Sequence, residues 1–219
     1  METAADLIAA FRDEASDKVK PYLWSDDWLL NIASEAEREA CRRAHLLVDS
    51  SASFCSVSVS ANDPLIDIDP LILDIRRAKL SISTYQLTPV KATEMDALNP
   101  GWEKHVGTPT TYVTDYQTNA IRLYPKQQVA CELNMSVSRL PLKSMASEDD
   151  KPEIRIEHRP GLVQWMLYRA YSKVDADGFN KAQADMALAR FEREFGQRSS
   201  ARNERWKNER PVIETPTIA

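Results

Sequence analysis

The sequence predicts an α+β protein in which N- and C-terminal helices form one four-helix bundle around an inserted antiparallel β-sandwich or barrel-like module. Three observations predict it. Apolar residues recur at steps of three and four near both ends of the chain, they alternate with polar residues in the middle, and the last segment follows neither period. We therefore expect the bundle at residues 1–50 and 158–196, the β-rich insertion at 51–157 and an extended C-terminal arm at 197–219.

Two helices are predicted before residue 50, over residues 3–17 and 25–48. Ser25 is the expected N-cap of the second helix, because Asp26 and Asp27 then lie at the positive end of the helix dipole. One apolar stripe follows, formed by Trp28, Ile32, Ala36, Ala40, Ala44 and Leu47. Its small alanines predict that a neighbouring helix packs closely against it.

The middle of the chain has the period of two that is typical of strands, with prolines between the segments. Candidate strands lie at residues 54–60, 65–68, 71–80, 82–87, 110–114, 120–124 and 129–137. Short strands with frequent turns favour a small sandwich or barrel. Residues 91–107 are expected to be irregular with one short helix, and the polar stretch 144–153 is expected to close the insertion.

Two more helices are predicted after the insertion. Pro160 suits the first turn of a helix that continues to about residue 173, and residues 175–178 are a break. The last helix covers about residues 180–195, and Gly196 is its natural C-cap. Its apolar positions are Ala184, Leu188, Phe191 and Phe195.

The composition argues against the familiar nucleotide enzymes and against a secreted protein. The chain has 219 residues but only 5 glycines, no two closer than six positions, so it holds no dinucleotide fingerprint, phosphate-binding loop or nucleophile elbow. Its three cysteines are scattered, which favours reduced thiols, and no zinc-site spacing is present. The acidic N-terminus lacks the basic and apolar regions of a signal peptide. We expect a protein made in the cytosol.

The best candidates for chemistry are four neighbouring aspartates, whose oxygens suit a divalent cation. They are Asp63, Asp67, Asp69 and Asp74. Because aspartates beside proline are also common turn residues, turn formation is the stronger interpretation. Residues 175–178 likewise lack the Glu that completes a calcium loop and predict a turn between helices.

The cysteines and one histidine are weaker candidates. Cys41, Cys55 and Cys131 have no His or Asn nearby in the sequence, so each is expected to be a small core residue. His158 precedes Arg159-Pro160 and is expected to contribute to the entry of a helix rather than to act as a base.

The C-terminal segment has a charge of its own. Residues 197–210 contain five basic and two acidic residues, which is +3 in a chain of net charge −5, so the remainder carries −8. Residues 211–219 are interrupted by proline and have no apolar period. A frayed terminus and an arm that becomes ordered on a partner both remain open. An acidic body also argues against sequence-specific DNA recognition.

Several segments resemble phage head-to-tail adaptor (connector) proteins, in the same order along the chain. They are residues 23–30 (LWSDDWLL), 35–44 (EAEREACRRA), 99–102 (NPGW), 107–109 (GTP), 123–125 (LYP), 139–141 (RLP), 162–171 (LVQWMLYRAY) and 191–196 (FEREFG). The resemblance covers about residues 5–196 and includes no catalytic signature.

The resemblance implies a structural protein of the virion neck, assembled in the host cytoplasm. Such proteins form a closed ring under the portal, expected to be a dodecamer, and present a platform to tail or nozzle proteins. The ring extends the channel through which double-stranded DNA passes without specific recognition. An acidic body fits that role, because it repels DNA phosphates from a channel wall. No enzyme activity, cofactor, metal or membrane is expected.

We assign the two contact surfaces by residue. The arm is expected to bind the portal through Arg198, Arg202, Arg205, Trp206, Lys207, Arg210, Ile213 and Ile218. The β-rich module is expected to face the tail through Trp102, His105 and Tyr112, with Trp102 exposed in its Pro-Gly-Trp turn. The opposite orientation remains open.

Two other functions also remain open. One is a small metal-dependent hydrolase built on Asp63, Asp67 and Asp69, and the other is a monomeric assembly chaperone.

Overall fold

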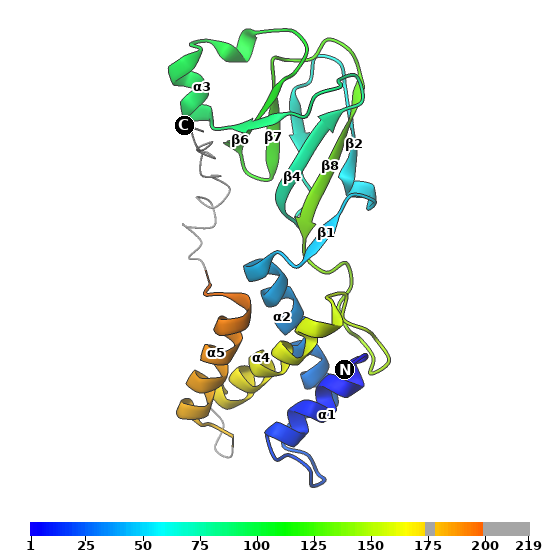
Figure 1. The fold of residues 1–219 in the computed structure, drawn as a ribbon, viewed down its shortest axis with the longest axis vertical. Helices are drawn as coiled ribbons and strands as arrows, with labels where there is room; N and C mark the ends of the chain where they lie inside the picture. The colour runs from blue at the N-terminus through cyan, green and yellow to red at the C-terminus, as the bar shows by residue number, and fades with distance from the viewer. Residues whose placement is uncertain (174–177, 199–219) are drawn as a thin grey trace, which may run out of the picture. The chain divides into compact units, whose positions relative to one another are not determined.

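A computed structural model describes residues 1–173 and 178–198 as a mixed α+β protein, which confirms the predicted class. These residues contain five α-helices and two four-stranded sheets (Figure 1). They divide into two compact units. Unit 1 comprises Met1–Asp49, Leu71–Leu73 and Ser138–Arg198, and unit 2 comprises Ser50–Pro70 and Asp74–Val137. The predicted β-rich insertion, residues 51–157, includes two segments that this division assigns to the helical unit, Leu71–Leu73 and residues 138–157.

Helix α1 (Ala4–Glu14) begins with a reciprocal cap. The Thr3 hydroxyl accepts the backbone N–H of Asp6, and the Asp6 carboxylate accepts the N–H of Thr3. Two of the N–H groups that a helix start leaves unpaired are satisfied in this way. The helix ends three residues earlier than the predicted limit of residue 17.

Helix α2 (Asp26–Ala44) begins as predicted, because Ser25 Oγ accepts the N–H of Trp28. Its predicted continuation to residue 48 is wrong. His45 has a φ of 50°, which ends the helix, and Leu47–Asp49 forms strand β1. The His45 ring nitrogen Nδ1 lies 2.8 Å from the hydroxyl of Ser138, a contact that no local pattern reveals.

Helices α4 (Arg159–Ser172) and α5 (Lys181–Phe195) complete unit 1. Pro160 occupies the first turn of α4, and the Asn180 side chain caps α5. Gly196 ends α5 with a φ of 86°, a conformation that favours glycine, so the predicted C-cap is confirmed. Of the predicted break at 175–178, residues 175–177 lie outside the described residues.

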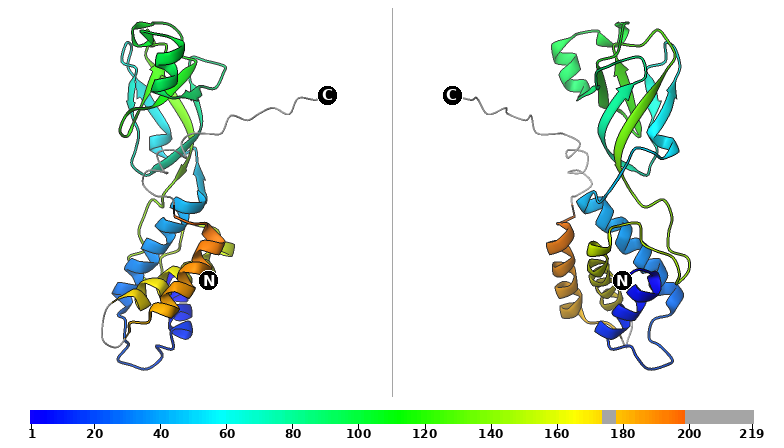
Figure 2. Two further views of the ribbon diagram at one scale, coloured as in Figure 1. Left: turned by 90° about the vertical axis from the view of Figure 1, so that its left-hand side faces the viewer. Right: turned by 45° about the vertical axis from the view of Figure 1, so that its right-hand side comes forward.

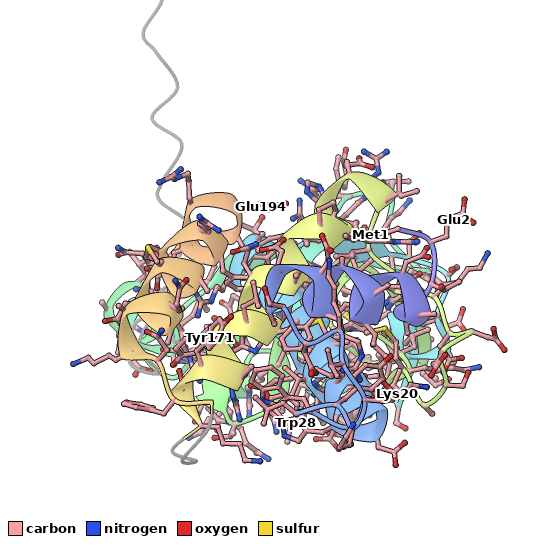
Figure 3. All side chains as sticks on the ribbon, turned by 90° about the horizontal axis from the view of Figure 1, so that it is seen from below. Met1, Glu2, Lys20, Trp28, Tyr171 and Glu194 are labelled. Atoms are coloured by element: carbon pink, nitrogen blue, oxygen red, sulfur yellow. The ribbon has the colours of Figure 1, made fainter. Side chains whose placement is uncertain are left out.

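The core of unit 1 forms where α4 contacts α1, α2 and α5. Helix α4 lies between α5 and α1 in the right-hand view of Figure 2 and in Figure 3. Ala36 and Ala40 of the α2 stripe are fully buried, as the predicted close approach requires. A Cβ on Gly161 would lie 2.7 Å from the ring of Phe195, so glycine permits the short distance between α4 and α5. Large fully buried side chains include Leu7, Phe11, Leu29, Ile154, Leu162, Met166 and Phe191.

The segment that precedes α4 is joined to the start of α1. The carbonyl groups of Glu148 and Asp150 accept the N–H groups of Ala5 and Ala4. The Arg159 guanidinium joins the same two regions, because it donates to the backbone carbonyls of Pro152 and Glu2. The polar stretch therefore packs within the helical unit.

Strand β8 (Cys131–Arg139) is the central strand of the first sheet, where it pairs with β1, β2 (Ser56–Val59) and β4 (Ile72–Leu80). Along β8, alternate residues are buried, as the period of two predicts: Leu133, Met135 and Val137. Residues 53–55, at the start of the predicted strand 54–60, form a 3₁₀ turn instead.

The second sheet has the strand order β3-β7-β6-β5. Its strands are Leu65–Asp67, Ala120–Tyr124, Thr111–Gln117 and Thr88–Val90, respectively. Strand β5 pairs parallel with β6, so the all-antiparallel expectation is wrong here. Residues 82–87 form a turn rather than the predicted strand, with a bridge between Lys79 and Gln86. Neither sheet closes into a barrel.

The irregular excursion at 91–107 contains the expected short helix, α3 (Ala92–Leu98). A 3₁₀ turn at Trp102–Lys104 follows Gly101, whose φ is 78°. Parallel pairing of β5 with β6 needs a crossover connection, and this excursion supplies it. Met95, Trp102 and Val113 form a small core between the excursion and β6.

Candidate functional site

The candidate aspartates Asp63, Asp67 and Asp69 lie in and around a turn and strand β3. Asp63 is exposed, and its Oδ1 accepts the N–H of Leu65, which is the short-range bond of a turn-forming aspartate. Asp67 is exposed at the end of β3, and Asp69 is partly buried beyond it. Within residues 1–173 and 178–198, no three His, Cys, Asp or Glu side chains are placed to hold a metal ion. In this part of the chain, Asp63, Asp67 and Asp69 therefore do not form the ligand set that the hydrolase alternative requires.

The cysteines do not form a nucleophilic site. Cys41 and Cys55 are buried and Cys131 is partly buried, and none of the three forms a disulfide. Burial, with a further contribution from the Glu37 carboxylate, raises the pKa of Cys41 to about 12. The Cys41 thiol is therefore protonated near neutral pH and is a poor nucleophile. His158 is the N-cap residue of α4, which confirms its expected place at a helix entry.

Two of the three expected platform residues are buried. Trp102 is 2% exposed and Tyr112 is 3% exposed, whereas His105 is exposed. The Trp102 Nε1–H donates to Asp96 Oδ1 at 2.8 Å, so both the ring and its polar group are satisfied inside unit 2. The expected exposure of Trp102 is wrong, because this indole packs with Met95 of α3 and Val113 of β6 in a small core.

Other side chains cover Trp102 and form what we call the Trp102 cluster: Trp102, His105, Tyr116, Arg122 and Tyr124. Tyr116 and Tyr124 meet the indole edge-on, each with a centroid separation of 5.9 Å. The Arg122 guanidinium lies 4.7 Å from the Tyr116 ring centre. Tyr and Arg are enriched at protein interfaces. The sequence reasoning missed Tyr116 and Arg122, although both lie on segments that were predicted as strands or adjoin them.

Of the expected portal-binding residues, Arg198 lies within the described part of the chain. The others lie outside the described residues: Arg202, Arg205, Trp206, Lys207, Arg210, Ile213 and Ile218. The structure therefore describes the place where the C-terminal segment leaves unit 1, and not the segment itself.

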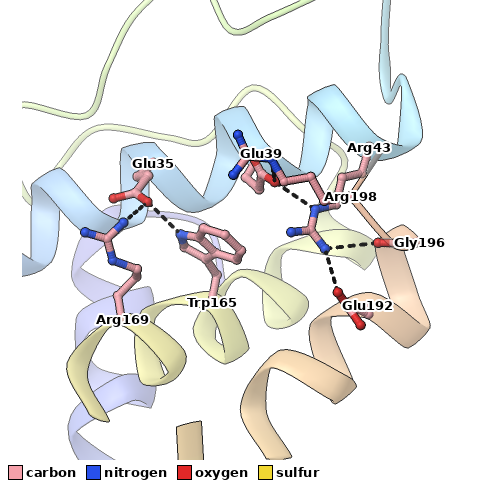
Figure 4. A network of polar contacts seen from close by, with 8 residues as sticks. All are labelled: Glu35, Glu39, Arg43, Trp165, Arg169, Glu192, Gly196 and Arg198. Carbon is pink, nitrogen blue, oxygen red and sulfur yellow. Dashed lines mark hydrogen bonds and ion pairs between the residues drawn. The ribbon is translucent and has the colours of Figure 1, made fainter. Parts of the chain in front are cut away.

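That place is a network that we call the arm root, formed by Glu39, Arg43, Glu192, Gly196 and Arg198 (Figure 4). The Arg43 guanidinium donates from Nε to Glu39 at 2.8 Å and from Nη1 to the carbonyl of Gly196 at 3.1 Å. Its Nη1 also lies 3.6 Å from the Glu192 carboxylate. Arg198 Nε lies 3.8 Å from the same Glu39 oxygen that Arg43 binds. Helix α2 thus holds the end of α5 directly.

The arm root is shielded from water on the α2 side. The Arg43 side chain is 4% exposed and that of Glu39 is 10% exposed. The Arg43 guanidinium also lies 5.3 Å from the ring centre of Trp165 and 5.1 Å from that of Phe191, within the range of cation–π contacts. Since a positive charge near the last carbonyls of a helix is favourable, Arg43 also stabilises the C-terminal end of α5.

A second ion pair joins α2 to α4, one helical turn before Glu39 of the arm root. Arg169 of α4 pairs with Glu35, and Trp165 Nε1–H donates to the same carboxylate at 3.3 Å. This pair is more exposed than the Arg43–Glu39 pair, at 42% for Arg169 and 35% for Glu35. The spacing of four between Glu39 and Arg43 predicts an ion pair along one helix. No sequence pattern near these residues predicts their contact with α5.

The comparisons with known proteins bear on the whole chain. A family model described as SU10 adaptor protein matches residues 2–214, so the match covers both units and extends into the C-terminal segment. A search of curated proteins finds no match. Across the two described ranges, no helix has both the length and the apolar character that a bilayer crossing requires.

Proposed function

The chain belongs to the family of SU10 adaptor proteins, and from this premise we propose that it forms a ring between the portal and the tail of a phage. The observation that carries the proposal is the family match over residues 2–214. The ring extends the DNA channel, and an excess of eight negative charges outside residues 197–210 supports passage of DNA without adhesion. The protein is thus a structural component of the virion.

We propose that residues 198–219 are the arm that binds the portal. The basic charge of this segment and the extension of the family match to residue 214 support the assignment. The arm root supports it as well, because Arg43 holds the Gly196 carbonyl and so fixes where the arm begins. An arm with a fixed starting point loses less conformational freedom when it binds than one that also frays at its base.

Deletion of residues 199–219 tests the arm. The truncated protein should keep its circular dichroism and melting temperature, since the described core ends at Phe195, but should lose association with the portal in mass photometry. A matched variant that replaces Ser199, Ser200, Asn203 and Asn208 with Ala keeps every charge and should still associate. Undiminished portal association of the truncated protein would show that another surface carries the contact.

We propose that unit 2 faces the tail through the Trp102 cluster. Exposed His105 and Tyr116 supply the contact, and the buried ring of Trp102, which Tyr116 meets edge-on, supports it from below. Buried Tyr112 is not part of the proposed contact. Tyr116→Ala should leave portal association intact and reduce attachment of tail proteins to the assembled ring. Thr118→Ala, an exposed change on the same hairpin, is the control. Equal tail attachment by the two variants would place the tail contact elsewhere.

A further inference from the structure

Helix α5 has an exposed line of residues on the side opposite to its buried one. Its members follow one another at steps of four, three and four: Ala182, Met186, Ala189 and Arg193. Met186 is 48% exposed between two alanines, and Arg190 lies beside the line. We call this set the α5 outer line. It is an apolar strip with basic side chains at its C-terminal end, and Asp185 is the acidic residue on its flank.

Helix α1 has an exposed line with the same spacing and the opposite charge. Its members on the helix are Asp6, Ala9 and Asp13, at steps of three and four, and Glu2 is an exposed acidic residue just before the helix begins. We call this set the α1 outer line. Lys18 pairs with Asp13 and Lys151 lies 3.8 Å from Glu2, but these contacts are made by highly exposed side chains and are therefore weak. Ala9 leaves a gap between carboxylates.

The two outer lines belong to helices that lie on either side of α4, and each line is on the side of its helix that faces away from the buried residues. Helix α4 contacts both α1 and α5 and lies between them in Figure 3. A closed ring with one kind of subunit needs this arrangement, because each copy must offer two unlike surfaces to its neighbours. Complementary charge also sets which surface meets which.

We propose that the α5 outer line of one copy packs on the α1 outer line of the next copy in the ring. Met186 fills the gap at Ala9, and Arg190 and Arg193 face the carboxylates of the neighbouring α1. The occupant of each surface is thus a second copy of this chain. The inference rests on the proposed ring and adds the residues through which its subunits meet.

Chemical cross-linking between two single variants tests the contact. In a Cys131→Ser background, protein with Met186→Cys is mixed with protein with Ala9→Cys and treated with a short bismaleimide. We expect a product of twice the chain mass, with residue 186 joined to residue 9, at a yield at least about tenfold above a control pair, as for an interface anchor. The control pairs Met186→Cys with Asn31→Cys, an exposed position on α2. Equal yields, or a product that joins 186 to 186, would overturn the proposal.

Copy number on the portal separates this inference from the proposed function. Met186→Asp should lower the number of copies on each portal, while Asn31→Asp, which adds the same charge at an exposed position of α2 outside both outer lines, should not. Ala9→Arg should act like Met186→Asp, because the larger side chain occupies the space that Met186 fills and adds a positive charge near Arg190 and Arg193. Full rings formed by Met186→Asp would refute the interface and leave the proposed function standing. Failure of the wild-type protein to associate with the portal would refute the function itself.

Discussion

Replacement of Arg43 by Met tests the arm root. The change keeps an unbranched apolar side chain against Trp165 and Phe191 but leaves the Glu39 carboxylate, at 10% exposure, without its closest cation. Breaking a buried ion pair at one end costs about 3–5 kcal/mol. Arg198 Nε lies 3.8 Å from Glu39 and can replace part of the lost contact, so we take the lower end of that range. The expected loss in the free energy of unfolding is about 3 kcal/mol.

The assay is thermal and urea unfolding followed by circular dichroism. For a chain of this size, about 3 kcal/mol corresponds to a melting temperature lowered by roughly 6–12 °C. The matched control is Arg169→Met, which breaks the exposed pair with Glu35 and should cost less than about 1 kcal/mol. The double variant Arg43→Met/Glu39→Met removes both charges and should recover most of the loss. If Arg43→Met lowers the free energy of unfolding no more than Arg169→Met does, burial does not make the Arg43–Glu39 pair important for stability.

Three further changes test other parts of the helical unit. Gly161→Ala should lower the free energy of unfolding by about 1–3 kcal/mol, because its Cβ would lie 2.7 Å from the Phe195 ring; a wild-type melting curve would contradict this. The Cys41 thiol, with its pKa raised to about 12, should be alkylated more slowly than that of Cys131 in the folded protein, as measured by mass spectrometry; equal rates would count against its burial. Burial raises the pKa of Glu37 above 4.5, so the native state retains this proton and loses stability as pH rises through the raised pKa. The free energy of unfolding of Glu37→Gln, measured in urea, should therefore rise relative to that of the wild type between pH 4.5 and neutrality. A difference between the two proteins that does not change with pH would refute the raised pKa of Glu37.

Helix starts were predictable because their causes are local. Ser25 caps α2 with an N–H three residues away, and Pro160 lies in the first turn of α4. The end of α2 was not predictable, because His45 adopts a positive φ beside Ser138, a residue 93 positions further along the chain. Apolar period alone continued that helix by four residues, since Leu47 fits the stripe.

Strand pairing and the candidate site depended even more on distant residues. Residues 82–87 have strand composition, yet β5 at Thr88–Val90 is the segment that pairs with β6. Trp102 lies in a Pro-Gly-Trp sequence that favours an exposed turn, but α3 and β6 enclose its ring. The pairing of Arg43 with Glu39 is predictable because the two are four positions apart, whereas the contact of Arg43 with Gly196 spans 153 positions.

Mass photometry of the protein mixed with its portal tests the central claim most directly. The account predicts a species heavier than the portal by many copies of 24.8 kDa. It also predicts that mass spectrometry detects the protein in purified virions, whereas an assembly chaperone would be absent from them. A portal of unchanged mass, together with absence of the protein from virions, would contradict the assignment as a head-to-tail adaptor.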